Sequence, residues 1–255
     1  MTSKIRLAEV VSTYQLSPHL RRVVFSGDDL LGFPLDRAGA HLKVLLPHPG
    51  EHMPVLAING TGDGSNKPIK RSYTVQHYDE KLNQLTLDFV VNRHAGPATN
   101  WAAQAQPGDL VGIAGPAPRK LDNMAASSYL LLGDLTSINA VKGFAKAINA
   151  EAKIHAIMLV PTADDIIVET GESLAIDWLV TDDSDVLTAR VRALAAHLHA
   201  DTHVFMGLEA RHIRSLRGLL QEEFGLPRQH IYAVGYWKGG LDADRFGADK
   251  QQNPL

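Results

Sequence analysis

The sequence contains no cysteine. This absence excludes disulfide bonds, a thiol nucleophile, and cysteine ligands for an iron–sulfur cluster or a zinc ion. A redox reaction carried out by this chain would therefore need an organic group to carry the electrons.

An excess of positive charge and long apolar runs are also missing. The 255 residues hold 25 Lys and Arg against 28 Asp and Glu, a formal net charge of −3, which gives no basic excess for nucleic-acid binding. No apolar run approaches the roughly 18 residues that span a bilayer, and residues 1–14 lack the basic-then-apolar order of a signal peptide. We therefore expect a cytoplasmic protein that binds neither nucleic acid nor membrane.

The first 120 residues have the polarity pattern of short strands separated by turn residues. Leu85, Leu87 and Phe89 alternate with polar residues, which is the period of a half-buried strand. The predicted strands cover residues 5–14, 20–25, 41–46, 71–78, 84–91 and 109–113. Strands of this number and length predict a small six-stranded antiparallel barrel.

Two segments interrupt the strand pattern. Residues 47–70 are rich in Gly, Pro and polar side chains and predict a long loop, which is typically functional or disordered. Further on, Gly96 and Pro97 precede an alanine-rich stretch, which predicts a single short helix with Pro97 in its first position.

The pattern changes after Gly115-Pro116-Ala117-Pro118, where apolar strands begin to alternate with helical stretches. We expect two domains, residues 1–120 and 121–255. The predicted strands of the second domain are 129–132, 154–160, 177–181, 203–206 and 231–237, and its predicted helices are 137–150, 185–198 and 209–224. This alternation predicts a parallel sheet covered by helices, and the acidic run 182–185 predicts a helix N-cap.

Arg71-Ser72-Tyr73-Thr74 combines a guanidinium, two hydroxyls and an aromatic ring. On a strand, Arg71 and Tyr73 share one face and Ser72 and Thr74 the other. A ring that stacks on a flat ligand beside an arginine suited to phosphate is what a flavin nucleotide needs. The alternative is a barrel strand with a surface arginine.

Gly96-Pro97-Ala98-Thr99 supplies a second candidate feature, because the free N–H groups of a helix N-terminus attract anions. A pyrophosphate would suit this position, and the alternative is an ordinary capped helix. Together with Arg71, this helix start would bracket one dinucleotide.

Seven motifs in order carry a resemblance to a known family. They lie at residues 71–75, 88–90, 94–102, 106–109, 112–116, 133–136 and 235–237. In these motifs the chain resembles the siderophore-interacting proteins, flavin-dependent ferric-siderophore reductases related to the ferredoxin reductases.

The resemblance implies an FAD-binding barrel followed by a domain similar to NAD(P)H-binding domains. It also implies that the flavin, and no side chain, carries out the reaction, and that Trp101 packs the short helix against the barrel. The positions that the resemblance assigns to cofactor binding are Arg71, Ser72, Tyr73, Thr74, Asp88, Phe89, Val90, His94, Gly96, Pro97, Ala98, Thr99, Thr136, Tyr236 and Trp237.

One departure from the family concerns the electron donor. Relatives commonly read Gly-Asp-Glu-Thr where this chain has Gly133-Asp134-Leu135-Thr136, and no Gly-x-Gly-x-x-Gly fingerprint follows. NADH, NADPH and a reduced ferredoxin all remain open as donors.

A ferric siderophore is large and multiply negative, so the resemblance implies a basic substrate cleft. The matching cations and their possible replacements are Lys43, Arg119, Lys120, Lys238 and Arg245, with Lys67 and Lys70 on the long loop as further candidates. Two alternatives stay open: a general NAD(P)H:flavin or ferredoxin-type reductase, and a siderophore or flavin carrier without activity. No metal site is expected at His197, His199 and His203, which lack an acidic or cysteine partner in ligand spacing.

Overall fold

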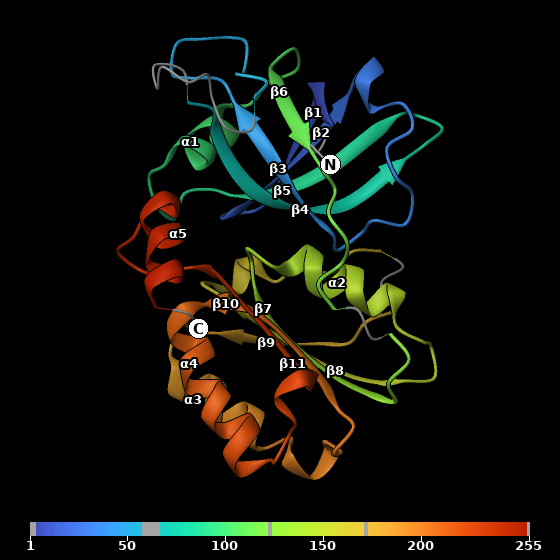
Figure 1. Ribbon diagram of the computed structural model, residues 1–255, viewed down its shortest axis with the longest axis vertical. Helices are drawn as coiled ribbons and strands as arrows, with labels where there is room; N and C mark the ends of the chain where they lie inside the picture. Colours follow the sequence, from blue (N-terminus) through green and yellow to red (C-terminus); the bar gives the residue numbers. More distant parts are fainter. Residues whose placement is uncertain (1–3, 58–66, 122–123, 171–172, 254–255) are drawn as a thin grey trace. The chain divides into compact units, whose positions relative to one another are not determined.

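The computed structural model describes residues 4–57, 67–121, 124–170 and 173–253. The chain divides into two compact units, Met1–Arg119 and Lys120–Leu255, and each has its own sheet (Figure 1). Within the described residues, no helix is long and apolar enough to cross a membrane.

The first unit is a closed barrel of six strands in the order β1-β2-β5-β4-β3-β6, with antiparallel neighbours, which confirms the predicted barrel (Figure 1). The strands are β1 (Ile5–Ser17), β2 (Leu20–Ser26), β3 (His41–Leu46), β4 (Ile69–Asp79), β5 (Gln84–Val90) and β6 (Leu110–Ala114). β1 runs past its predicted end at residue 14, because Ser17 still pairs with Leu20 at the hairpin.

The barrel interior is filled by the alternating apolar residues of its strands. Leu85, Leu87 and Phe89 are all fully buried on β5, as their spacing predicts. The helix α1 (Pro97–Gln104) begins with Pro97 in its first turn, which is also as predicted. Trp101 of α1 stacks on Phe25 with ring centroids 6.3 Å apart, so this helix is fastened to the barrel through an aromatic contact.

The long loop predicted over residues 47–70 ends earlier than expected, since β4 begins at Ile69. Residues 58–66 of that loop lie outside the described residues.

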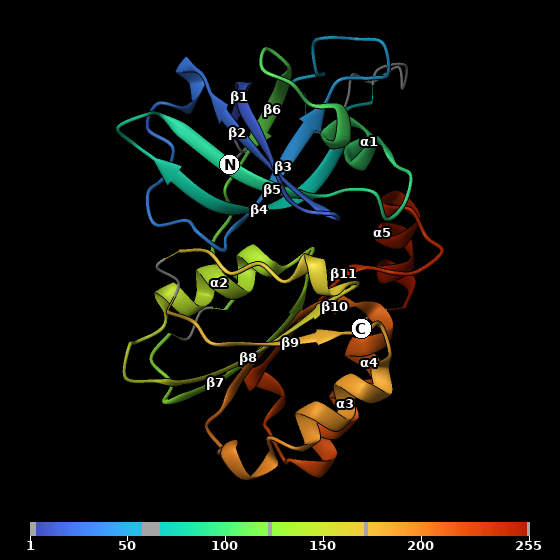
Figure 2. The ribbon, with the colours of Figure 1, turned by 180° about the vertical axis from the view of Figure 1, so that it is seen from behind.

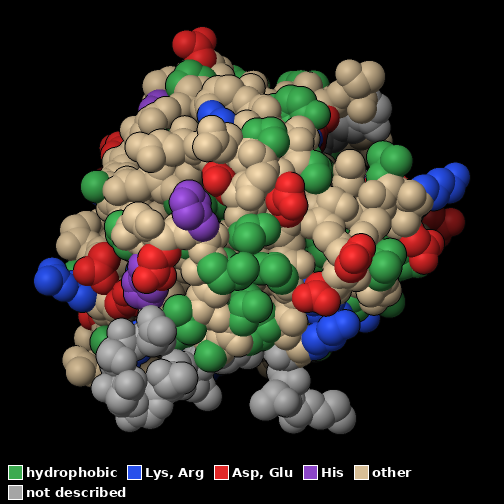
Figure 3. Space-filling view, turned by 90° about the horizontal axis from the view of Figure 1, so that it is seen from above, with side chains coloured by type: hydrophobic (Ala, Val, Ile, Leu, Met, Phe, Trp, Pro, Cys, Tyr) green, Lys and Arg blue, Asp and Glu red, His purple; other side chains and the backbone are tan. Residues whose placement is uncertain are grey.

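Seen from above in Figure 3, the molecule presents a face on which hydrophobic side chains gather beside several acidic ones, and Lys and Arg are sparse there.

The second unit is a five-stranded sheet in the order β11-β10-β7-β8-β9 with parallel neighbours, which confirms the predicted parallel sheet (Figure 2). Its strands are β7 (Ser128–Asp134), β8 (Lys153–Val160), β9 (Ile176–Val180), β10 (His203–Glu209) and β11 (Ile231–Trp237). The central strand β7 is buried along its whole length, which is typical of a parallel strand covered on both faces.

Helices cover both faces of this sheet, with α2 on one side and α3 and α4 on the other (Figures 1 and 2). Right-handed crossovers that run in opposite directions along the sheet produce this arrangement. The helices are α2 (Ile138–Ala147), α3 (Ser184–Arg192), α4 (Ala210–Gly218) and α5 (Ala243–Gln252), and shorter helical turns cover Asp28–Leu30, Ala163–Asp165, Ala195–His197, Leu219–Glu223 and Arg228–His230.

The predicted helices 137–150 and 185–198 are too long: α2 ends at Ala147, and α3 ends at Arg192 before a separate turn. The predicted helix 209–224 is confirmed almost in full, since α4 continues from Leu219 as a π-helical turn. The N-cap predicted within 182–185 is confirmed, since the Asp183 side chain accepts a hydrogen bond from the Asp185 amide. α5 was missed because Phe246 is its one buried residue, which leaves little apolar periodicity to detect.

Candidate functional site

The candidate site in the first unit begins on β4. Tyr73 is partly buried and packs on Phe89 with ring centroids 4.1 Å apart, and Thr74 is buried beside it. Burial raises the pKa of the Tyr73 phenol, and the neighbouring Arg71 charge offsets this only in part. The hydroxyl therefore stays protonated at neutral pH and can donate a hydrogen bond.

Arg71 and Ser72 lie next to each other at the start of the same strand. Arg71 Nη1 donates to the Lys70 carbonyl at 2.8 Å, and Ser72 is exposed. Lys43 pairs with Ser72 across β3 and β4, and its ammonium donates to the Ser72 hydroxyl at 2.5 Å. Lys43 therefore belongs to the face of the barrel that carries Ser72.

The start of α1 has the features of an anion site. Gly96 is its N-cap residue, and no side chain caps the helix there. The Gly96 amide donates to Asn100 Oδ1 at 3.3 Å, while Ala98 and Thr99 are buried in the first turn. The N-terminal partial charge of α1 suits an anionic group, and an ordinary helix that begins at the N-cap Gly96 stays the alternative.

Phe89 connects these two features. Its ring lies 4.1 Å from Tyr73 and 5.6 Å from Trp101, measured between centroids. β4 and α1 therefore meet on one aromatic cluster, defined here as Phe25, Tyr73, Phe89 and Trp101. An aromatic ring, a guanidinium and an uncapped helix start on neighbouring elements fit the flat ring and the phosphates of FAD.

Other residues predicted for the cofactor lie elsewhere on the same elements. Asp88 alternates with Phe89 on β5, and its carboxylate accepts two hydrogen bonds from the Arg22 guanidinium at 2.8 and 2.9 Å. Val90 lies on the same side of β5 as Asp88 and is partly buried, and His94 is exposed ahead of α1. Asp88 is therefore held in a cross-strand ion pair, a role that its motif did not predict.

In the second unit, Thr136 and Trp237 meet at the carboxyl ends of β7 and β11. Both bind Asp134: the Thr136 amide donates to Oδ1 at 2.8 Å, the Thr136 hydroxyl donates to the same oxygen, and Trp237 Nε1 donates to Oδ2 at 2.8 Å. Asp134 is 9% exposed and was not among the predicted site residues. The sequence feature that could have indicated Asp134 is an acidic residue at the end of an apolar strand.

Two glycines allow α2 to begin close against the sheet. Gly133 on β7 and Gly207 on β10 are register partners, and Ser137 Oγ donates to the Gly207 carbonyl at 2.6 Å. A Cβ at Gly133 would lie 2.6 Å from Ser137 Oγ and 2.8 Å from Met158 Sδ, where no atom fits. In many nucleotide-binding domains one glycine-rich turn lets the helix lie close to the sheet. In this chain two glycines on neighbouring strands have that effect.

Several of the predicted substrate cations already have partners. Arg119 donates to the Asp36 and Ala38 carbonyls at 2.5 and 2.9 Å. Lys238 forms an ion pair with Asp249 at 2.8 Å and, through this hydrogen bond, lowers the pKa of that carboxyl.

Arg245 is largely exposed and lies 3.4 Å from Asp242, and Lys67, Lys70 and Lys120 are also exposed. Tyr236 is partly buried on β11 next to Trp237. Several predicted cations are therefore accessible to solvent. Arg119 and Lys238 instead bind groups of the chain itself.

Replacing Trp237 with phenylalanine removes one donor from the buried Asp134 carboxylate. We expect the free energy of unfolding to fall by about 1–3 kcal/mol, because hydrogen bonds to charged groups are worth more than neutral ones and this oxygen has little access to water. Urea denaturation measures the change. Trp178→Phe on β9 is the matched control, since the Trp178 indole makes no hydrogen bond within the described residues; an equal loss in both variants would contradict the role of the bond.

The fold resembles that of ferredoxin reductases. A ferredoxin NADP+ reductase from Neisseria gonorrhoeae, solved with bound FAD and NADP, aligns over 92% of this chain and 100% of its own with a TM-score of 0.64 and 14% identity, a likeness of fold alone.

Closer relatives identify the family. Residues 9–120 match the model of the siderophore-interacting FAD-binding domain, and residues 126–240 match that of the siderophore-interacting protein. The ferric vibriobactin reductase ViuB of Vibrio cholerae is 30% identical over 96% of this chain and 93% of its own length. The siderophore-interacting protein SipS from Aeromonas hydrophila superposes with a TM-score of 0.84 at 29% identity over 98% of both chains. The chain belongs to the siderophore-interacting protein family, with a siderophore-interacting FAD-binding domain at its N-terminal side.

Proposed function

We propose that this protein is an FAD-dependent enzyme that reduces the iron of a ferric siderophore from Fe(III) to Fe(II). The observation that carries the proposal is that Tyr73 and Trp101 of α1 both pack on the Phe89 ring, which brings the helix without a side-chain cap close to β4, inside the region that matches the FAD-binding family model. The ferric reductase activity named for ViuB supports it further.

The chain's own residues would bind and orient the cofactor. The α1 amides and the Arg71 guanidinium would hold the phosphates, and the Tyr73 ring, backed by Phe89, would pack on the flavin. When bound there, FAD would supply the redox chemistry that links a nicotinamide or ferredoxin donor to a one-electron ferric acceptor. Because hard anionic oxygen ligands favour the higher charge of Fe(III), reduction would weaken the complex and favour release of the metal.

The donor, the substrate contacts and the location are parts of the same proposal. NADH, NADPH and a reduced ferredoxin are the candidate donors. Lys43, Arg119, Lys120, Lys238 and Arg245 are the candidate substrate-binding cations. Lys43 and Lys120 are exposed, so they are the first to test. The cytoplasmic location stays a prediction.

Anaerobic stopped-flow absorbance at the flavin band tests the activity. We expect one of the three donors to bleach the band of the FAD-loaded protein, and a ferric tris-catecholate complex to restore it. A reduced flavin that the ferric complex never reoxidises would favour the carrier alternative. Equal reoxidation by ferric complexes of any charge, unchanged in Lys43→Gln and Lys120→Gln, would favour a general reductase.

Arg71→Ala is expected to weaken FAD binding by about ten- to a hundredfold, because a charge-assisted hydrogen bond to phosphate contributes about 1.5–3 kcal/mol. Quenching of flavin fluorescence, titrated with apoprotein, gives the dissociation constant. Lys81→Ala, an exposed cation in the turn between β4 and β5, is the control and should bind FAD as the parent does. Equal affinity in the Arg71 variant would remove this residue from the cofactor site.

A further inference from the structure

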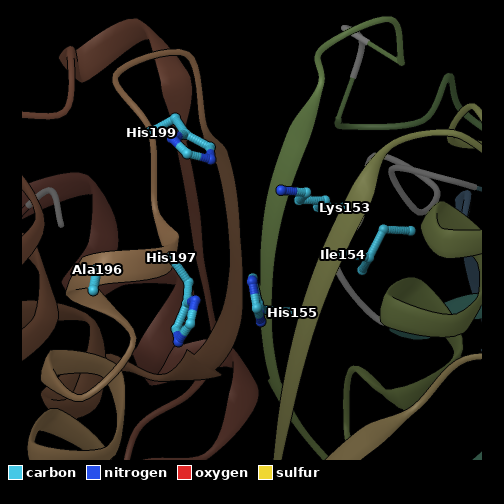
Figure 4. Close-up of a pocket in the computed structure, with 6 residues that line it drawn as sticks. All are labelled: Lys153, Ile154, His155, Ala196, His197 and His199. Atoms are coloured by element: carbon cyan, nitrogen blue, oxygen red, sulfur yellow. The ribbon is translucent and has the colours of Figure 1, made fainter.

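The second unit contains a solvent-open cavity of about 380 Å³, and none of its lining residues is among those predicted for the cofactor or the substrate. Figure 4 shows its six lining residues. Lys153, Ile154 and His155 are the first residues of β8, while Ala196 and His197 come from the helical turn Ala195–His197 and His199 follows it.

The polar side chains of the cavity are all cations or potential cations. His155 and His197 face each other with ring centroids 5.9 Å apart, and His199 and Lys153 extend into the same gap (Figure 4). No carboxylate lines the cavity among the described residues. Burial, followed by the neighbouring charges of His197 and Lys153, lowers the pKa of His155. Burial and these neighbouring charges therefore disfavour protonation of His155.

A metal ion does not fit this arrangement. Nowhere in the described ranges do three His, Asp or Glu side chains come together in a way that could hold a metal. An ammonium and several imidazole side chains, which gain a second N–H donor when they are protonated, instead match the donors that oxyanions accept. The ligand that this chemistry selects is a small anion with more than one negative charge.

We propose that this cavity binds a doubly charged oxyanion of the size of sulfate or phosphate, and that binding is coupled to protonation of His155. The cavity lies at the start of β8, whereas Asp134 and Trp237 lie at the carboxyl ends of parallel strands. It is therefore at the opposite end of the strands from Asp134 and Trp237, and the proposal does not depend on the proposed function.

The sign of the pH dependence follows from linkage. An anion beside the His155 ring favours its charged form, so binding raises the pKa of His155, and affinity must rise as the pH falls and His155 becomes protonated. Asp201 is the nearby acid: its hydrogen bond from Ser127, with smaller effects from His199 and His203, lowers its pKa, so its charge stays constant over the same range.

Sulfate is the probe, because it keeps its double charge between about pH 5.5 and pH 8 while histidine changes its own. Imidazole proton resonances of the full chain are followed by NMR as sodium sulfate replaces sodium chloride at constant ionic strength. We expect saturable shifts at His155 and His197, with affinity at least about tenfold higher at the lower pH.

Variants separate this site from general electrostatics. His155→Gln combined with His197→Gln should abolish the pH-dependent affinity, and Lys153→Gln, at an exposed position, should weaken binding at both pH values. His77→Gln, which removes an exposed histidine of the barrel, should change nothing. Shifts that sodium chloride reproduces, equal affinity at the two pH values, or binding that survives in the double variant would each overturn the proposal.

Discussion

Asp88→Ala is expected to destabilise the barrel by about 3–5 kcal/mol, measured as the free energy of unfolding of the apoprotein in urea. The Asp88 carboxylate is 2% exposed and takes two hydrogen bonds from Arg22, whose side chain is 17% exposed. Removing the carboxylate leaves a guanidinium in a poorly hydrated position, and the desolvation of that charge is no longer offset.

Two comparisons make this prediction specific. The double variant Arg22→Met with Asp88→Leu should recover most of the lost stability, because both charges leave together. Glu223→Ala, which breaks the solvent-exposed pair with Arg192, should leave the unfolding transition almost unchanged. An Asp88→Ala protein with parental stability but weak FAD affinity would contradict the prediction and assign Asp88 to the cofactor instead.

Gly133→Ala is expected to destabilise the second unit by about 1–3 kcal/mol, the usual effect of an added methyl group in a closely packed core. The new Cβ would meet Ser137 Oγ, Met158 Sδ and Val141 Cγ2, all within 3.0 Å. Ser137 cannot yield easily, because its hydroxyl bonds both the Asp134 backbone and the Gly207 carbonyl. Thermal or urea unfolding measures the loss.

Gly247→Ala is the matched control for the glycine prediction. Gly247 lies within α5, where an added Cβ meets nothing within 4 Å. Alanine is favoured over glycine in a helix interior by roughly 0.5–1 kcal/mol, so this variant should be slightly more stable than the parent. If Gly133→Ala were equally harmless, the close contact between α2 and the sheet would not be what requires a glycine at this position.

The barrel and the parallel sheet could be predicted because their strands are short, regularly patterned and separated by strong turn residues. The alternation of Leu85, Leu87 and Phe89 is a local property, and so is the position of Pro97 at the start of α1. The motif residues Tyr73 and Phe89 were also found, although their contact depends on how β4 and β5 pair.

What could not be predicted depends on groups far apart in the chain. Asp134 and Trp237 meet only because β7 and β11 belong to one sheet, and Arg22 reaches Asp88 only because β2 pairs with β5. The helix α5 could not be predicted for a different reason: a helix with one buried side chain has almost no hydrophobic periodicity. Motif matching locates residues, but it does not show which partners hold them.

The order of strands has a consequence for the folding of the nascent chain. All six barrel strands lie between Ile5 and Ala114, so the first unit has every partner it needs once that stretch has left the ribosome. The central strand β7 pairs with β10, which ends at Glu209, so the second sheet cannot form its middle until most of the polypeptide has been synthesised. Domains usually fold as units during translation, beginning with the N-terminal one. The barrel should therefore be complete while one edge of β7 is still unpaired. An unpaired strand edge can pair with another chain, so we expect the growing chain to be most prone to aggregation during this interval.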